Sequence, residues 1–286
     1  MLPITVVLPV YHRVLPEQFR ASFASVVDQT EPVAEIIVVA DGPLPDPLED
    51  LVTRLVAETS TASLERLEVN SGTGIATNLA LAKATQPWFA RQDADDISLP
   101  DRFEKSWRRL EVGDIAGLGG ALAEFEGDPS NIVGIRRLPA TSAELARYVR
   151  VNCPINTPTS IVSVEAARAV GGIRPLHLME DYDLFARLVA GGYRLENLPE
   201  TLVLFRADPA MFQRRRDAKL IGAEWQMQRN LHRYGLVSRP RSWVNFVARM
   251  GARLMPAWLY AVMYQRVFRN TTDLETPAGA PPAAQR

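Results

Sequence analysis

The sequence has few residues of the kinds that build disulfides and zinc sites. Its 286 residues include one cysteine, Cys153, so no intramolecular disulfide can form, which fits a reducing compartment. The three histidines, His12, His177 and His232, are scattered along the chain. Zinc is usually held by clustered cysteine and histidine ligands, so this composition argues against a zinc site.

Long apolar runs are also absent. No stretch approaches the roughly 20 residues that a membrane-spanning helix needs. The N-terminus, Met1 to Thr5, has neither a basic segment nor a cleavage site, so we do not expect a signal peptide. With 47% hydrophobic and 23% charged residues, the chain can form one large domain or one domain with an appendage. We therefore expect a cytoplasmic protein.

Charge is distributed unevenly, although the net charge is only −1. Residues 206–269 contain 13 Lys and Arg against 3 Asp and Glu, whereas residues 1–205 contain 18 against 28. Such asymmetry indicates a basic face turned toward an anionic partner, either nucleic acid or a membrane. No nucleic-acid recognition motif accompanies the basic residues, so we expect no nucleic-acid partner.

Three carboxylates lie within the four residues Asp93 to Asp96. Such a cluster costs free energy unless a cation or solvent compensates it, so it indicates a divalent metal site; the alternative is a solvated acidic loop. An EF-hand starting at Asp93 fails at two of three diagnostic positions, where Ile97 and Ser98 stand. Hard cations held by carboxylates and phosphates, Mg²⁺ or Mn²⁺, remain. Ser98 to Pro100 is a plausible helix start.

The first hundred residues alternate between strand-like and helix-like patterns. We expect strands at 4–10, 35–40, 64–69 and 88–91, and helices at 19–27, 48–55 and 75–84. Repeated strand–helix–strand units predict a parallel sheet, and such sheets bind ligands beyond the carboxyl ends of their strands. Residues 9–11, Asp41 and residues 93–96 should therefore gather at one edge.

Several motifs, in order, resemble the signatures of family 2 glycosyltransferases with a GT-A fold. They are residues 7–11, 29–30, 35–42, 70–76 and 93–96. Residues 41–44, 96–104 and 180–184 are similar to the amylovoran-biosynthesis-type branch, which builds bacterial exopolysaccharides. The resemblance covers residues 4–269. It implies a Rossmann-like α/β GT-A catalytic domain over 1–206, with a mixed, mostly parallel sheet.

The resemblance also implies a donor site. Asp93 and Asp95 match the DXD pair, with Asp93 near the ribose or the metal and Asp95 helping to hold the Mn²⁺ or Mg²⁺ that bridges the diphosphate. Asp41 matches the residue that meets the nucleotide base, although Ala40 replaces the first Asp that many members have. Asp41 could instead cap a tight turn before Pro43.

Further donor contacts follow from the same resemblance. They are expected at Pro9, Tyr11, Asn70, Gly74, Asn78, Ala94, Arg214 and Arg215. The guanidinium groups suit a diphosphate because they form bidentate hydrogen bonds. A solvated basic turn explains that arginine pair equally well.

On the acceptor side, Glu180 and Asp181 match an acidic pair of the family. The resemblance makes Asp181 the base that deprotonates the acceptor hydroxyl, a role that needs a carboxylate separate from the metal. Both could instead be the acidic first turn of a helix over 181–190, favoured by its dipole. Both interpretations hold if Glu180 is structural and Asp181 catalytic. Thr157 stands where close relatives often have His, on the acceptor side.

The C-terminal third carries apolar residues at helical spacing beside arginines. We expect a basic amphipathic helical appendage over 207–269, followed by a disordered tail over 270–286. Such helices lie at a membrane surface or pack on the catalytic domain, and the sequence leaves both open.

The expected function is that of an inverting glycosyltransferase. It would move a sugar from a nucleotide-sugar donor, for which UDP is the better choice, to a saccharide or lipid-linked saccharide in cell-surface polysaccharide biosynthesis, at the inner face of the cell membrane. The alternative is a non-catalytic glycosyltransferase-like subunit that binds sugar or membrane in an assembly complex. Asp93, Asp95 and Asp181 argue against that alternative. A nucleotidyltransferase would need a Gly-rich phosphate loop after the first strand, which Tyr11 to Arg13 do not supply.

Overall fold

The computed structural model of the chain describes residues 1–207 and 219–254. Its centre is a nine-stranded sheet with the order β3-β2-β1-β4-β8-β6-β9-β5, in which β7 pairs with the C-terminal part of β6. The strands are β1 Leu2–Val10, β2 Val33–Asp41, β3 Ala62–Leu67, β4 Trp88–Arg91, β5 Ile97–Ser98, β6 Gly117–Phe125, β7 Ile132–Arg136, β8 Ile161–Ser163 and β9 Leu195–Arg206.

Six of these strands run in one direction. Strands β1, β2, β3 and β4 pair in parallel, and β6 and β9 point the same way, whereas β5, β7 and β8 are antiparallel to their neighbours. The sheet is therefore mixed and mostly parallel, as the sequence predicted. Strand β1 is buried on both faces because helices cover both sides, which explains its nearly continuous apolar run.

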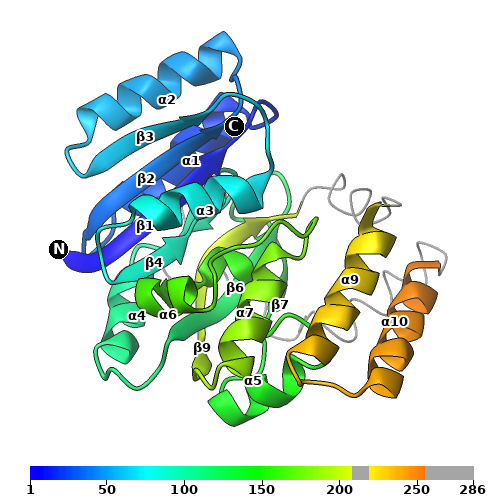
Figure 1. Cartoon of the computed structure of the whole chain (residues 1–286). Coiled ribbons are helices and arrows are strands. Elements are labelled where there is room, and N and C mark those ends of the chain that lie inside the picture. The colour runs from blue at the N-terminus through cyan, green and yellow to red at the C-terminus, as the bar shows by residue number, and fades with distance from the viewer. Residues whose placement is uncertain (208–218, 255–286) are drawn as a thin grey trace.

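Two layers of helices enclose the sheet, one on each face (Figure 1). Even-numbered β1 residues such as Val6 and Leu8 pack with α1 and α2, and odd-numbered Val7 packs with α3 and α7. The helices are α1 Pro16–Val27, α2 Asp46–Glu58, α3 Thr73–Lys83, α4 Arg102–Leu110, α5 Ser142–Tyr148, α6 Val164–Ala169, α7 Glu180–Ala190, α9 Lys219–Arg233 and α10 Arg239–Leu254, with a 3-10 turn η1 at Thr157–Thr159.

The helix expected to start near Ser98 begins later, at Arg102. Ile97 and Ser98 form β5 instead, because they pair with Leu204 and Val203 of β9. A hydrogen-bonded partner distant in sequence decided this, and local pattern cannot reveal such a partner.

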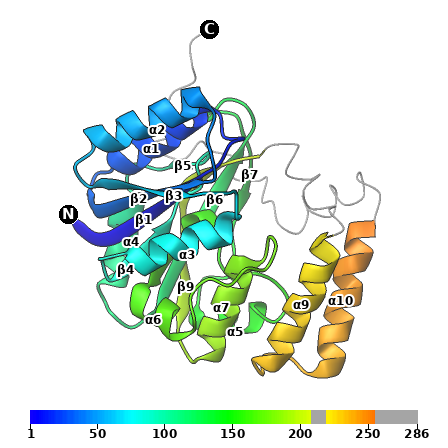
Figure 2. The same ribbon diagram turned by 45° about the horizontal axis from the view of Figure 1, so that its top comes forward.

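Helix α9 packs on α7, and α10 packs on α9 (Figure 2). Leu220, Ala223, Met227 and Leu231 form one stripe of α9, and it packs against Tyr182 and Ala186 of α7. Helix α9 is thus a packed helix, one of the two alternatives that the sequence left open. Within residues 1–207 and 219–254, no helix is long and apolar enough to cross a bilayer. Arg214, Arg215, the rest of the appendage after residue 254 and the tail 270–286 lie outside the described residues.

Candidate active site

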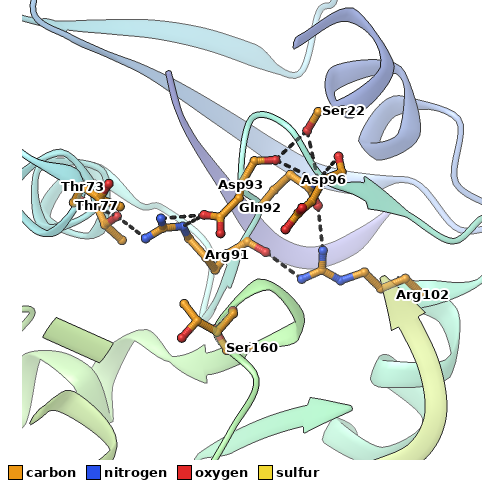
Figure 3. Close-up of polar contacts among 10 residues, drawn as sticks. Ser22, Thr73, Thr77, Arg91, Gln92, Asp93, Asp96, Arg102 and Ser160 are labelled. Carbon is orange, nitrogen blue, oxygen red and sulfur yellow. Dashed lines mark hydrogen bonds and ion pairs between the residues drawn. The ribbon is translucent and has the colours of Figure 1, made fainter. Parts of the chain in front are cut away.

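The acidic loop, residues 93–96, follows β4 and is held in place by hydrogen bonds from buried polar side chains (Figure 3). Gln92, fully buried, donates from Nε2 to the carbonyl of Asp96 at 2.9 Å and to the hydroxyl of Ser22 at 3.0 Å. That hydroxyl in turn donates to the carbonyl of Asp93 at 2.8 Å. These bonds hold the backbone of the loop without using its carboxylates.

A second buried support is the Arg102 side chain, which enters from α4. Its guanidinium donates to Oε1 of Gln92 at 2.8 Å and to the carbonyl of Arg91 at 2.7 Å. Burial lowers the pKa of Arg102 to about 9, while the nearby carboxylates of Asp96 and Asp93 act in the opposite direction. The acidic loop therefore lies above an enclosed positive charge that offsets part of its self-repulsion.

The three carboxylates of the loop have different environments. Asp96 is buried, and its Oδ1 accepts a hydrogen bond from the backbone N–H of Arg206 at 2.9 Å. Burial, and then the charges of Asp95 and Asp93, raise the pKa of Asp96. Asp93 and Asp95 are only half-buried. The first and third positions of the loop are thus partly exposed, whereas the fourth lies in the interior.

Asp93 makes an ion pair with Arg91. Nε and Nη2 of Arg91 both donate to Oδ1 of Asp93, at 2.9 and 2.6 Å. Within the parts of the chain that the structure describes, Oδ2 of Asp93 accepts no hydrogen bond. Arg91 therefore holds one oxygen of Asp93, and among the described residues no hydrogen bond engages the other.

Asp41 ends β2 beside this loop and binds the segment before α3. Its two carboxylate oxygens accept hydrogen bonds from the amides of Ser71, at 2.6 Å, and Gly72, at 3.0 Å, and its carbonyl accepts one from Asn70 at 3.1 Å. Gly42 has φ +84°, and a Cβ there would lie 2.5 Å from the Asn70 nitrogen. Asp41 and Asn70 thus join the turn after β2 to the segment 70–72 before α3. The contact of Asp41 with a base stays a prediction.

Gly74 and Asn78 connect α3 to the acceptor side. A Cβ on Gly74 would lie 2.6 Å from Cγ of Glu180, so glycine lets α7 approach the start of α3. Oδ1 of Asn78 accepts a hydrogen bond from the N–H of Ile173 at 2.9 Å, in the segment that leads to α7. In this structure both positions help to place α7, and their predicted nucleotide-sugar contacts remain untested.

Glu180 and Asp181 form the start of α7. Burial raises the pKa of Asp181; Arg91 and a hydrogen bond from Thr157 act against this effect, and Asp93 adds to it. Burial raises the pKa of Glu180 to about 7, and Asp181 adds to the rise. Thr157 therefore lies within hydrogen-bonding distance of Asp181, and Asp181 has a raised proton affinity of the kind that suits a general base. The acceptor-side roles of both residues stay predictions.

Arg91 and Asp181 line one small cavity, together with Thr77 of α3 and Ser160 after η1. The guanidinium of Arg91 thus pairs with Asp93 and lines a cavity with Asp181. Arg91 was missed in the sequence, as were Gln92, Arg102 and Ser22. Of these, Arg91 could have been found from the sequence, because it is a charged residue at the end of a buried strand, two positions before the DXD pair.

The remaining expected donor residues lie at the same edge of the sheet. Pro9 pairs with Val39 between β1 and β2, Tyr11 follows β1, and Ala94, within the acidic loop, is buried against the core. Parallel pairing of β1 with β2 and β4 brings these segments to one edge of the sheet, as expected, and their contacts with a donor stay predictions.

The carboxylates fit a hard divalent ion that shares its ligands with a substrate. Within residues 1–207 and 219–254, no set of three or more carboxylate, imidazole or thiolate groups could hold an ion alone. Mg²⁺ is usually bound through one or two carboxylates plus substrate phosphates, and the half-buried Asp93 and Asp95 offer such oxygens. When bound, the ion would neutralise charge on the departing diphosphate.

The sheet is mixed and mostly parallel, the acidic loop follows β4, and Asp181 of α7 lines a cavity with Arg91 at the end of that strand. This arrangement is that of a GT-A nucleotide-sugar transferase. The family model described as glycosyl transferase family 2 matches residues 5–170, and the chain belongs to this family. It is a glycosyltransferase.

Two relatives match this chain over almost its whole length. The amylovoran biosynthesis glycosyltransferase AmsE of Erwinia amylovora is 31% identical, over 92% of this chain and 98% of its own. An Escherichia coli UDP-Gal:alpha-D-GlcNAc-diphosphoundecaprenol beta-1,3-galactosyltransferase is 26% identical, over 93% and 96%. The first of these relatives is of the amylovoran type that the motifs resemble.

A solved structure has the same fold. The mannosyltransferase PcManGT of Pyrobaculum calidifontis, in complex with GDP-Man and Mn²⁺, superimposes with a TM-score of 0.61 over 92% of this chain and 79% of that one, at 17% identity. This likeness establishes the GT-A fold.

Proposed function

We propose that the protein is an inverting glycosyltransferase that moves a sugar from a UDP-sugar to a saccharide acceptor carried on a lipid. The observation that supports this proposal is the cavity lined by both Arg91 and Asp181, because Arg91 also forms an ion pair with Asp93 of the predicted donor motif. The galactosyltransferase relative, whose name includes UDP-Gal and a diphosphoundecaprenol acceptor, supports this choice of donor and acceptor.

In the proposed reaction, Asp181 accepts the proton of the acceptor hydroxyl as that oxygen attacks the anomeric carbon of the donor. The new carbon–oxygen bond forms on the face opposite the bond to the diphosphate, which breaks and releases the nucleoside diphosphate. The proton passes from Asp181 to solvent. Asp93 and Asp95 orient the diphosphate and would hold the divalent ion. One-step displacement inverts the configuration.

The decisive experiment combines a donor panel with Asp181→Asn. UDP-, GDP- and dTDP-sugars with Mn²⁺ are tested for nucleotide release and for protection of the protein against heat. The variant keeps the shape of the side chain but not the base, so turnover should fall by about 100-fold or more, with donor affinity nearly unchanged. Asp114→Asn, in an exposed ion pair, is the control. Retained activity would place the base elsewhere, and heat protection by a donor without turnover would favour the non-catalytic subunit.

The metal is tested separately with Asp95→Asn. This change removes one charged ligand at a half-buried position, so Mn²⁺-dependent UDP binding should weaken while the melting temperature without ligand stays the same. Titration calorimetry of UDP with and without Mn²⁺ measures the effect. If Mn²⁺ improves UDP binding equally in the variant and in the wild type, Asp95 is not a ligand.

We further propose that α10 adsorbs to the inner face of the cell membrane, where a lipid-linked acceptor would be found. Its side chains Trp243, Val244 and Val247 are 55%, 59% and 61% exposed, and the helix carries arginines but no acidic residue. Tryptophan and basic residues are the usual elements of interfacial helices.

Flotation with vesicles containing anionic lipid tests this surface. Val247→Ser and Trp243→Ser should reduce binding, whereas Val112→Ser, which changes a valine that is 66% exposed outside this helix, should not. High salt should weaken binding because exposed charges are screened. Equal binding of all variants would show that α10 is not the contact.

A further inference from the structure

The side chain of Arg91 lies inside the molecule and is surrounded by functional groups. It ends β4, is 7% exposed, and uses all three guanidinium nitrogens for side-chain contacts (Figure 3). Nε and Nη2 donate to Oδ1 of Asp93, and Nη1 donates to the hydroxyl of Thr77 at 2.7 Å. A buried cation of this kind needs such partners, because burial opposes its charge.

Thr77 transmits the position of α3 to this guanidinium. Its hydroxyl donates to the carbonyl of Thr73 at 2.7 Å, which leaves the oxygen lone pairs to accept from Arg91. Thr73 begins α3 directly after the segment that Asp41 binds. Through Thr77, Arg91 therefore connects the acidic loop to α3, the helix that begins directly after the segment bound by Asp41.

The acceptor side also meets this group. Asp181 lines the same cavity, and the charges of Asp181 and Glu180 both act on the Arg91 guanidinium. Asp93, on the other side, raises the proton affinity of Asp181, while Arg91 lowers it. Carboxylates of the donor motif and of the base thus repel one another, and Arg91 is the described cation that contacts or faces all of them.

We propose that Arg91 is a positioning residue for transfer: it holds Asp93 with a single oxygen turned to the donor, and it allows the Asp181 carboxylate to lie beside the donor motif. This inference rests on the proposed function. The planar guanidinium is needed because two of its nitrogens grip one oxygen while the third reaches Thr77. A lysine ammonium keeps the charge but lacks this fork.

Three variants separate charge, geometry and bulk. Arg91→Met removes the charge, Arg91→Lys keeps it, and Thr77→Val removes only the hydroxyl that orients the guanidinium. Arg109→Met is the control, because Arg109 also binds two carboxylates, Glu196 at 2.8 Å and Asp114 at 2.7 Å, through contacts separate from the cavity. Each protein is examined by calorimetric titration of UDP with Mn²⁺, steady-state kinetics with the donor that the panel selects, and thermal unfolding.

We expect Arg91→Met to weaken UDP binding about 10-fold and to lower kcat by about 10-fold or more, because the half-buried carboxylate of Asp93 loses its partner and its fixed orientation. Arg91→Lys should restore part of kcat but little of the donor affinity. Thr77→Val should raise the donor KM a few-fold with a small effect on kcat, by the loss of about one hydrogen bond. Arg109→Met should change the melting temperature only.

A purely structural role predicts a different result. If the Arg91 variants lower the melting temperature but keep the wild-type KM and kcat, the inference is wrong. Should Arg91→Met fail to fold, unchanged kinetics of Arg91→Lys and Thr77→Val together would also overturn it. If no nucleoside diphosphate in the panel binds the wild type, the proposed function fails first, and this inference fails with it. If the wild type binds and turns over while all Arg91 variants match it, only the inference fails.

Discussion

Replacing Arg249 of α10 should destabilise the whole domain, because this residue neutralises a buried charge. Glu224 of α9 is fully buried, and Nε of Arg249 lies 2.8 Å from its Oε1. A second nitrogen, Nη1, donates to the carbonyl of Val151 at 2.9 Å. Burial opposes the charge of Arg249, and Glu224 more than compensates, so the pKa of Arg249 is raised.

The size of the effect follows from these contacts. Breaking one side of a fully buried ion pair costs about 3–5 kcal/mol. Here the cost is smaller, because the Nε–H is not aligned on Oε1, Arg249 is 27% exposed, and Gln228 still donates to Glu224 at 3.1 Å. We therefore expect Arg249→Met to cost about 2 kcal/mol of unfolding free energy. For a domain of this size that corresponds to a melting temperature lower by about 4–8 °C.

Urea unfolding of a double-mutant cycle measures the pair itself. Glu224→Gln removes the buried charge and keeps the shape, so the double variant with Arg249→Met should lose less than the two single variants together. We expect a coupling of about 1–2 kcal/mol. Single effects below about 0.5 kcal/mol that simply add would refute the reasoning. The same pair explains why point variants such as Trp243→Ser test membrane binding better than deleting α10, which would leave Glu224 without Arg249.

Three smaller predictions follow from titration and hydrogen bonding. Burial raises the pKa of Glu180 from 4.5 to about 7, so its contribution to stability is present below pH 4.5 and is lost as the pH rises through 7. The melting temperature of Glu180→Gln should not show this loss, and a pH dependence identical to that of the wild type would contradict the prediction. Burial raises the pKa of Cys153 to about 12, so iodoacetamide at pH 8 should react far more slowly with native than with urea-unfolded protein, and equal rates would contradict the buried thiol. Tyr234→Phe removes a 2.8 Å hydrogen bond to the buried Asp183, which Asn230 also binds, and should cost about 1 kcal/mol in urea unfolding; no change would mean that the bond is not formed in solution.

Local pattern determined most of the framework. The apolar run of β1 requires cover on both faces, and its alternation with helical spacing dictates parallel strands whose carboxyl ends share one edge. That edge brings Asp41 and Asp93 together, because each directly follows or ends a strand of the parallel set. The DXD spacing and the acidic pair at the start of α7 were legible for the same reason: each lies within a few residues of an element boundary.

The tertiary structure decided which charges face one another. Arg91 reads in the sequence only as the last residue of a short strand, and its partners lie 14 residues upstream at Thr77 and 90 residues downstream at Asp181. Likewise, Ile97 and Ser98 became a strand through pairing with β9, and Arg249 became the ion-pair partner of the buried Glu224. Periodicity fixes which face of an element is apolar, whereas the pairing of distant polar groups depends on how the layers stack, because only packing brings them within hydrogen-bonding distance.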